Sequence, residues 1–177
     1  NDEVCPDLQL DIIYKGTLFT EDEWNKFPGI HNKVHSIRIS TDAASKDTFE
    51  TLRRLGNYPE FLDNVAFLKS LRDRGIIKEL KFSFTYQLQN FREMKEFVLF
   101  CRHYSADYAI FERLQNISFT REEFVEKAVH FASHPLNEEF LSIVRDPIFT
   151  SSDVWHDFDY DGVQKMSSDE ARQRASK

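Results

Sequence analysis

Short apolar segments with the period of a β-strand alternate along this chain with longer segments that have the period of an α-helix. The strand-like segments are residues 8–14, 35–41, 79–85 and 107–112. Each is separated from the next by a helical pattern, in which apolar residues recur at spacings of three or four. Strands joined by helix-length connections pair in parallel through right-handed crossovers. The alternation therefore predicts an α/β fold with these strands in one parallel sheet, in sequential order, and helices outside it.

Capping residues indicate where most of the helices begin. Four candidate caps are each followed three residues later by a Glu, which is the pattern of a capping box or a close relative of it: Thr20, Asn57, Asn90 and Thr120. A further helix is expected from about residue 46 to residue 54. Pro135 opens the last predicted helix, which ends near Val144.

The length of the chain, 177 residues, is enough to bury one sizeable core. Seventeen Phe and six Tyr against only five Gly are typical of a well-packed globular body. From Thr150 onward the sequence changes to Ser, Asp, Lys and Arg with few apolar residues. We therefore predict a folded domain over residues 1–149 and a polar, poorly ordered tail over residues 150–177.

Charge and composition exclude several classes of protein. The net charge of −7 argues against binding to nucleic-acid backbones, which favours basic proteins. No apolar run approaches the roughly 20 residues of a membrane span, so no membrane partner is expected. No signal peptide is recognisable, and Cys5 and Cys101 form no disulfide framework, so we expect a cytoplasmic protein. The chain begins at Asn1 without a Met, as a fragment or a processed protein would.

The stretch from Val34 to Gly56 combines a strand, a polar turn and a helix. It resembles the fourth strand and following helix of the radical S-adenosylmethionine (radical SAM) barrel, nearest to its peptide-maturing, SPASM-related branch. That branch often has a strand ending in Ser-x-Asp-Ala, then an aromatic residue, an Arg and a Gly-Asn pair. The corresponding residues here are Ser40, Asp42, Ala43, Phe49, Arg53, Gly56 and Asn57.

The resemblance extends over about Leu8 to Asn116. LDIIYKGTLFT resembles the third strand and its turn, with Gly16 and Leu18 kept and Tyr14-Lys15 in place of Thr-Asn. FSFTYQLQNFREM resembles the fifth strand, and DYAIFERLQN the sixth. The resemblance thus implies a partial radical SAM, TIM-like barrel of about four β-α units.

The sequence departs from the family in lacking the first two strands and the CxxxCxxC loop. In the family this loop holds a [4Fe–4S] cluster through three thiolates, and the cluster in turn holds S-adenosylmethionine. Two separate cysteines cannot replace the loop. The resemblance therefore implies that a parent protein uses both cofactors, whereas this chain alone stably holds neither and supplies no catalytic residue or metal ligand.

The resemblance also implies a role for three residues, Ser40, Asp42 and Arg53, in binding S-adenosylmethionine. In the full barrel the matching Ser and Arg approach the methionine moiety and the ribose. A guanidinium pairs well with a carboxylate, and a serine hydroxyl can form a hydrogen bond with a ribose or a carboxylate. The alternatives are that Ser40 only lines a strand end, Arg53 is a solvated charge, and Asp42 caps the following turn. If the assignment is right, Arg53 faces the strand that carries Ser40, and Arg54 points elsewhere.

Three other patterns have plainer interpretations. Asp157, Asp159, Asp161 and Gly162 match the start of an EF-hand loop, but Gln164 and Ser168 depart from it later. His130 and His134 have the spacing of a zinc helix, but Phe131 stands where the motif needs Glu, so two surface histidines are favoured. Cys101 lies on an apolar helical stripe and is predicted to be a core residue.

The function expected from these features is that of the C-terminal portion of a radical SAM enzyme. Its parent would cleave S-adenosylmethionine reductively to a 5′-deoxyadenosyl radical that acts on an unknown substrate. The alternative is a non-catalytic α/β interaction module or remnant. In either case a truncated sheet exposes an edge, so we expect a partner: the missing N-terminal half of the barrel, or another protein that covers that edge.

Overall fold

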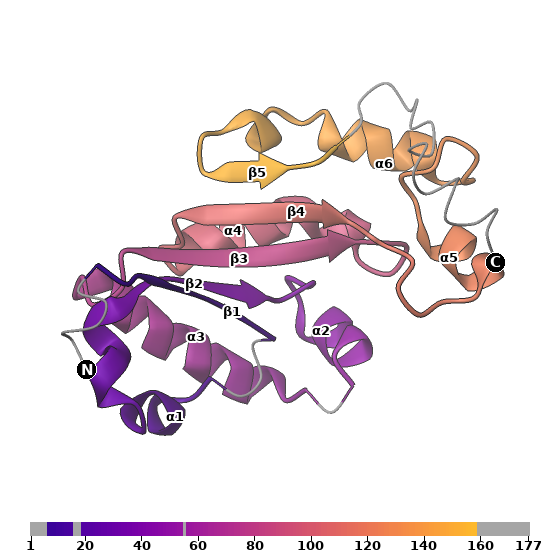
Figure 1. Cartoon of the computed structure of the whole chain (residues 1–177). Coiled ribbons are helices and arrows are strands. Elements are labelled where there is room, and N and C mark those ends of the chain that lie inside the picture. Colours follow the sequence, from indigo (N-terminus) through magenta and orange to yellow (C-terminus); the bar gives the residue numbers. More distant parts are fainter. Residues whose placement is uncertain (1–6, 16–18, 55, 159–177) are drawn as a thin grey trace.

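The computed structural model describes residues 7–15, 19–54 and 56–158. Its centre is a five-stranded, wholly parallel sheet in the order β1-β2-β3-β4-β5 (Figure 1). The strands are Leu10–Tyr14, Val34–Ser40, Glu79–Tyr86, Tyr108–Arg113 and Val154–His156. The first four begin and end within two residues of the predicted segments, and their predicted parallel, sequential order is confirmed.

The fifth strand was not predicted. β5 lies inside the segment 150–177 that the sequence assigned to a poorly ordered tail, yet it pairs in parallel with β4, Ala109 opposite Val154. The start of the tail at residue 150 is therefore wrong, because the sheet continues to His156. β5 is only three residues long and lies among polar residues, too short for an alternating pattern to show. Residues 159–177 lie outside the described part of the chain.

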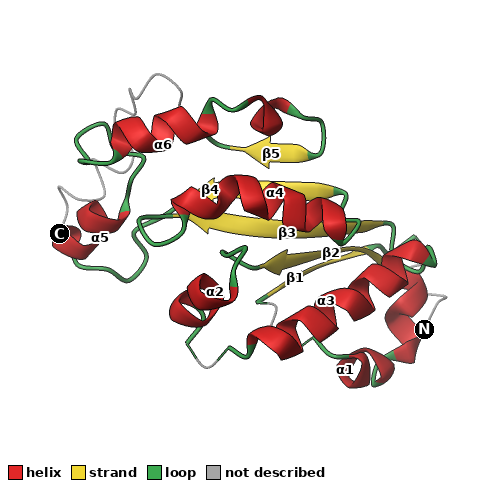
Figure 2. Cartoon of the chain, turned by 180° about the vertical axis from the view of Figure 1, so that it is seen from behind, coloured by secondary structure: helices red, strands yellow, loops and turns green. Residues whose placement is uncertain are grey.

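Helices connect successive strands. The α-helices are α1 Glu21–Asn25, α2 Lys46–Leu52, α3 Tyr58–Asp73, α4 Met94–His103, α5 Arg121–Lys127 and α6 Asn137–Val144. Three 3₁₀ turns accompany them: η1 Pro28–Lys33, η2 Phe91–Glu93 and η3 Pro147–Thr150. Seen from behind, α2, α3 and α4 lie in front of the sheet, on the same face (Figure 2). The opposite face carries no helix among the described residues.

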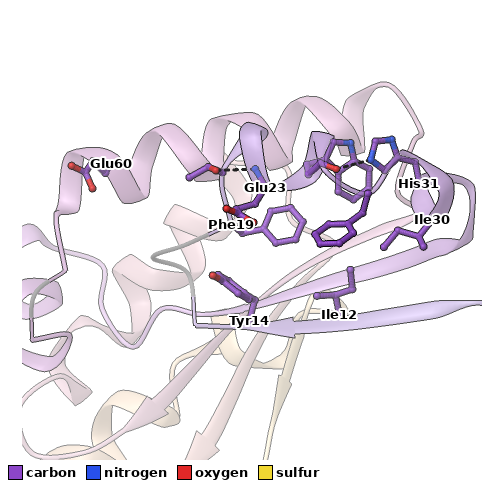
Figure 3. A pocket seen from close by; sticks show the side chains of 10 residues that line it. Ile12, Tyr14, Phe19, Glu23, Ile30, His31 and Glu60 are labelled. Carbon is purple, nitrogen blue, oxygen red and sulfur yellow. Dashed lines mark hydrogen bonds between the residues drawn. The ribbon is translucent and has the colours of Figure 1, made fainter.

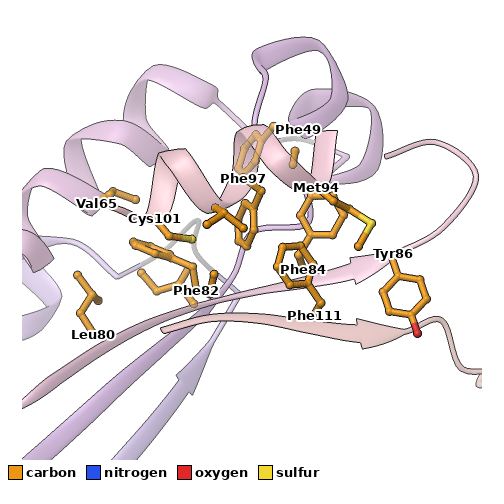
Figure 4. Packing of buried hydrophobic residues seen from close by; sticks show 14 of the residues in the cluster. Phe49, Val65, Leu80, Phe82, Phe84, Tyr86, Met94, Phe97, Cys101 and Phe111 are labelled. Carbon is orange, nitrogen blue, oxygen red and sulfur yellow. The ribbon is translucent and has the colours of Figure 1, made fainter. Parts of the chain in front are cut away.

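The core lies between this helical layer and the sheet. Leu80, Phe82, Phe84 and Tyr86 alternate along β3 and are each at most 1% exposed. Phe84 points toward α4, where Phe97 packs on it with ring centroids 4.8 Å apart (Figure 4), and the Tyr86 ring stacks on Phe140 of α6. Since successive residues of a strand point to opposite faces, the residues between them point to the open face of the sheet. Cys101 is 2% exposed in this core, as predicted.

Most helix starts agree with the predicted caps. Thr20 accepts a hydrogen bond from the Glu23 N–H at 3.1 Å, and Asn57 accepts one from the Glu60 N–H at 3.2 Å. Thr120 and Glu123 form a full capping box. Asn90 is the exception, because its side chain makes no cap. The last helix begins at Asn137, two residues beyond the predicted Pro135.

Candidate functional site

The three residues that the sequence singled out lie together at the carboxyl end of β2. Ser40 is its last residue, and Asp42 follows in a left-handed conformation with φ +61°. Asp tolerates this conformation better than most residues. The Asp42 Oδ1 accepts a hydrogen bond from the Thr85 N–H at 2.7 Å. Asp42 therefore ties the end of β2 to β3, and the alternative role as a cap for its following turn is not what its carboxylate does.

Arg53 joins the end of α2 to the same place. Its Nη2 donates to the Ser40 carbonyl oxygen at 2.9 Å and also to the Asp42 carboxylate. The side chains of Arg53 and Asp42 are each only 17% exposed, so the ion pair is largely shielded from water. The Nε of Arg53 is buried and finds no partner within the described residues. The geometry predicted for Arg53 is confirmed, and its neighbour Arg54 is exposed.

Gly56 permits the tight turn that follows Arg53. Its N–H donates to the Arg53 carbonyl oxygen at 2.7 Å. A Cβ at residue 56 would lie 2.8 Å from that oxygen and 2.9 Å from the Phe49 ring, closer than real Cβ atoms approach. The tight turn between α2 and α3 therefore requires glycine, which explains the Gly of the motif.

Ser40 also has a neighbour on the open face. The register places Ser40 opposite Ser83, and Ser83 opposite Ile110. The Ser83 hydroxyl donates a long hydrogen bond of 3.4 Å to the Ser40 hydroxyl. Two serines thus stand side by side, Ser40 at the end of β2 and buried Ser83 within β3.

Asn90 is a further member of this site that the sequence misassigned as a helix cap. Its Nδ2 donates to the carbonyl oxygens of Asp42 and Thr85, each at 2.9 Å, and its Oδ1 accepts from the Gln87 N–H at 2.8 Å. The residue is 1% exposed. All of the amide's strong donors and its acceptor are used to fix the loops after β2 and β3, so its role is positional.

Glu93 also reaches toward the loop after β2. Its carboxylate accepts hydrogen bonds from the Ala44 and Ser45 N–H groups, at 2.8 and 3.1 Å, and from the Ser45 and Thr48 hydroxyls. Burial raises the pKa of Glu93, but these hydrogen bonds outweigh burial and leave the pKa below its ordinary value. The carboxylate therefore stabilises the start of α2, instead of pairing with Asn90 in its own helix.

The open face of the sheet, on which Ser40 lies, also carries charged pairs. Arg38 forms an ion pair with Glu112, reaching from β2 to β4 across β3. Lys81 pairs with Glu79 at 2.6 Å on β3 itself. Exposed Trp155 stands opposite Ile110 at the β5 end of this face. The face is thus polar near β2 and β3 and apolar near β5.

The residues weighed as metal ligands are engaged otherwise. Asp157 accepts hydrogen bonds from the Tyr86 hydroxyl at 2.8 Å and from Arg113, and the other acidic positions of the EF-hand pattern lie outside the described residues. His130 and His134 follow the end of α5 and do not share a helix. Burial raises the pKa of the Cys101 thiol well above its ordinary value. No group of three or more potential metal ligands occurs among the described residues.

No protein-family model matches this sequence, and no curated protein does either. Among solved structures, the chain is similar to that of TYW1, a radical SAM enzyme, determined with a lysine-pyruvate adduct bound. The match covers 81% of this chain and 41% of the TYW1 chain, at 13% identity and a TM-score of 0.50. It shows the fold: this parallel sheet and its helices are arranged as in part of a TIM-like barrel. The chain spans less than half the length of the TYW1 chain.

In such a barrel, ligands bind at the carboxyl ends of the strands. This is where Ser40, Asp42 and Arg53 converge. The guanidinium can hold a carboxylate, and the paired serine hydroxyls can bond hydroxyl or carboxylate oxygens. The thiols do not fit an iron–sulfur cluster, because Cys101 is buried in the core and the cluster loop is absent from the sequence. None of the described helices is long and apolar enough to span a membrane.

Proposed function

We propose that this chain is the C-terminal portion of a radical SAM enzyme and that the end of β2 contacts S-adenosylmethionine. The observation that carries the proposal is the convergence of Ser40, Asp42 and Arg53 on one strand end in a sequentially ordered parallel sheet. A shielded guanidinium beside the half-buried Ser40 hydroxyl suits a ligand with a carboxylate and a ribose. The resemblance of the sequence to the SPASM-related branch supports the same assignment.

Each residue has a separate task in this proposal. Arg53 holds the amino acid carboxylate, and Asp42 keeps the guanidinium oriented when no ligand is bound. The Ser40 hydroxyl bonds a ligand oxygen, with Ser83 as its neighbour. Asn90 and Glu93 fix the loop that carries Asp42, so that these groups need little reorganisation on binding.

The cofactors supply the radical chemistry, and the cluster belongs to a part of the protein beyond this chain. When both are bound, reductive cleavage of S-adenosylmethionine would give a 5′-deoxyadenosyl radical that abstracts hydrogen from the substrate. No step of that reaction is assigned to a residue here. The proposed partner is the N-terminal half of the same barrel.

Product analysis tests this proposal. The protein expressed from its complete natural gene would be reconstituted anaerobically, reduced, and incubated with S-adenosylmethionine. Formation of 5′-deoxyadenosine and methionine is expected, and so is its loss when the gene is shortened to residues 1–177. A natural gene product that forms no cluster and no 5′-deoxyadenosine would contradict the proposal and favour a non-catalytic α/β module.

A further inference from the structure

The connection between β1 and β2 leaves a pocket of about 700 Å³ on the helix-covered face of the sheet (Figure 3). The regular elements of this connection are the five-residue helix α1 and the six-residue turn η1, whereas the next connection includes α3, of 16 residues. Elements this short cover little of the strand beneath them. Apart from Glu60, the described lining residues come from the segment 12–31. The pocket is therefore a feature of one connection of this chain.

The pocket lies near the end of β2, but on the opposite face of the sheet from the Ser40 hydroxyl. Tyr14, the last residue of β1, lines the pocket and is paired with Ile39. Because successive residues of a strand point to opposite faces, Ile39 shares the helix-covered face with Tyr14, and Ser40 points to the open face. The sheet thus separates a ligand in this pocket from one at the Ser40 site.

Aromatic rings form most of the wall of the pocket. The Tyr14 and Phe19 rings have centroids 5.6 Å apart and planes at 72°, and the Phe19 and Trp24 rings follow at 5.9 Å and 49°. Rings inclined in this way form several sides of one space instead of a single stack. His31 stacks on Trp24 with planes 9° apart, and its Nε2 lies 2.9 Å from the Trp24 carbonyl oxygen, which holds the indole in place. Phe27, 58% exposed, lies at the mouth.

The charge around the pocket is negative. Glu23 and Glu60 line it, and none of the described lining residues is a Lys or an Arg. Glu23 also pairs with Lys26, but the two side chains are 46% and 58% exposed, and an ion pair so open to water contributes little. Burial raises the pKa of the Tyr14 phenol, and the negative charge of Glu23 raises it further. The Glu23 carboxylate therefore acts electrostatically on a group that lines the pocket.

We propose that this pocket binds a small organic cation, an alkylated ammonium group carried on an apolar or aromatic body. A cation is attracted both to the faces of aromatic rings and to carboxylates, and here both surround one cavity. The apolar body would fill the rest of the volume, which has room for one drug-sized molecule. An anion would be repelled by the two carboxylates, and a neutral ligand would gain nothing from them. The site goes beyond the proposed function and does not depend on it.

Isothermal titration calorimetry of the protein expressed from its complete natural gene tests this proposal. Choline and 3,3-dimethylbutan-1-ol are the first pair of probes, because they have the same shape and differ in that a neutral carbon replaces the charged nitrogen. We expect choline to bind about tenfold more tightly than the alcohol. Benzyltrimethylammonium should bind more tightly than choline, because its ring buries additional apolar area.

Variants locate the binding of benzyltrimethylammonium. Phe19→Leu keeps an apolar side chain but removes an aromatic face, and Glu23→Gln removes a charge, so each should weaken binding about threefold or more. Glu21→Gln, an exposed change in the same first turn of α1, is the control and should have no effect. The Tm of each variant shows whether it folds. Where Phe19→Leu does not fold, Phe27→Leu at the exposed mouth takes its place.

Equal affinities for choline and the alcohol would overturn the proposal, because the pocket would then have no preference for charge. So would the absence of binding at millimolar benzyltrimethylammonium. Equal losses from Glu23→Gln and Glu21→Gln, with none from Phe19→Leu, would also overturn it, because they assign binding to the acidic surface of α1 alone. Charge-selective binding by a protein that forms no 5′-deoxyadenosine would uphold this inference while contradicting the proposed function.

Discussion

Arg53 and Asp42 form a shielded ion pair that joins the end of α2 to the loop after β2. Asp42 holds the Thr85 N–H with its other oxygen, so one carboxylate connects β2, β3 and α2. The pair explains why both residues belong to the same motif although 11 positions separate them. It also means that any anion bound by Arg53 must share the guanidinium with Asp42.

Asp42→Ala should destabilise the protein by about 2–4 kcal/mol, because it removes the carboxylate that pairs with the shielded Arg53 guanidinium and leaves the Thr85 N–H without its acceptor. Asp42→Asn should cost less, since an amide oxygen can still accept from Thr85 and Asn also tolerates positive φ. Urea denaturation of residues 1–177 would measure both. Equal stability of Asp42→Ala and the unaltered chain would show that the connection contributes nothing.

Glu93 should make the stability of the fold depend on pH in the acidic range. Because its folded-state pKa is lowered, its contribution is fully present above the pKa of the unfolded chain, about 4.3, and is lost as pH falls through the folded-state value. Glu93→Gln should therefore lower Tm at pH 7 and weaken the loss of Tm between about pH 5 and pH 3. Glu96→Gln, the same change on the exposed side of α4, is the control. Parallel Tm curves for Glu93→Gln and the unaltered chain would contradict this assignment.

Residues 1–177 should self-associate, because β1 is an edge strand with Ile13 exposed on the open face. Sedimentation velocity over a range of concentrations would measure the association. Ile13→Lys should weaken it, since a charge on an edge strand opposes pairing, whereas Ile117→Lys should not. A clean monomer at high concentration would count against truncation and favour a stand-alone module.

Residues 1–177 should hold no stable iron–sulfur cluster. They supply only Cys5 and Cys101, and Cys101 is buried in the core. Anaerobic reconstitution followed by iron and sulfide analysis is the measurement, with the natural gene product as the comparison. Stoichiometric cluster in the monomeric short chain would show that ligands outside the cysteine pattern suffice.

The sequence predicted those parts of the fold that depend on local patterns. Alternation located four strands, and Thr20, Asn57 and Thr120 marked helix starts because each cap is completed within three residues. Asn90 has the same local signature, but its amide bonds Asp42 and Thr85, a tertiary arrangement that no local pattern distinguishes from a cap.

The same limit applies to the site. Ser40, Asp42 and Arg53 were found because a motif groups them within 14 residues. The Arg38–Glu112 pair crosses an intervening strand, and its partners are 74 positions apart. Glu93 stabilises a helix 45 positions before it. Such contacts follow only from the register of the sheet, which sequence alternation alone does not fix.

Calorimetric titration of S-adenosylmethionine into the cluster-bearing natural protein tests the central claim most directly. Arg53→Ala should weaken binding by about 1.5–3 kcal/mol, the range for hydrogen bonds to charged groups. Arg54→Ala, an exposed neighbour, should change binding little. A Tm measured for each variant separates lost binding from lost folding. Equal effects of the two variants, or no effect of Arg53→Ala in a folded protein, would contradict the assignment of this site to S-adenosylmethionine.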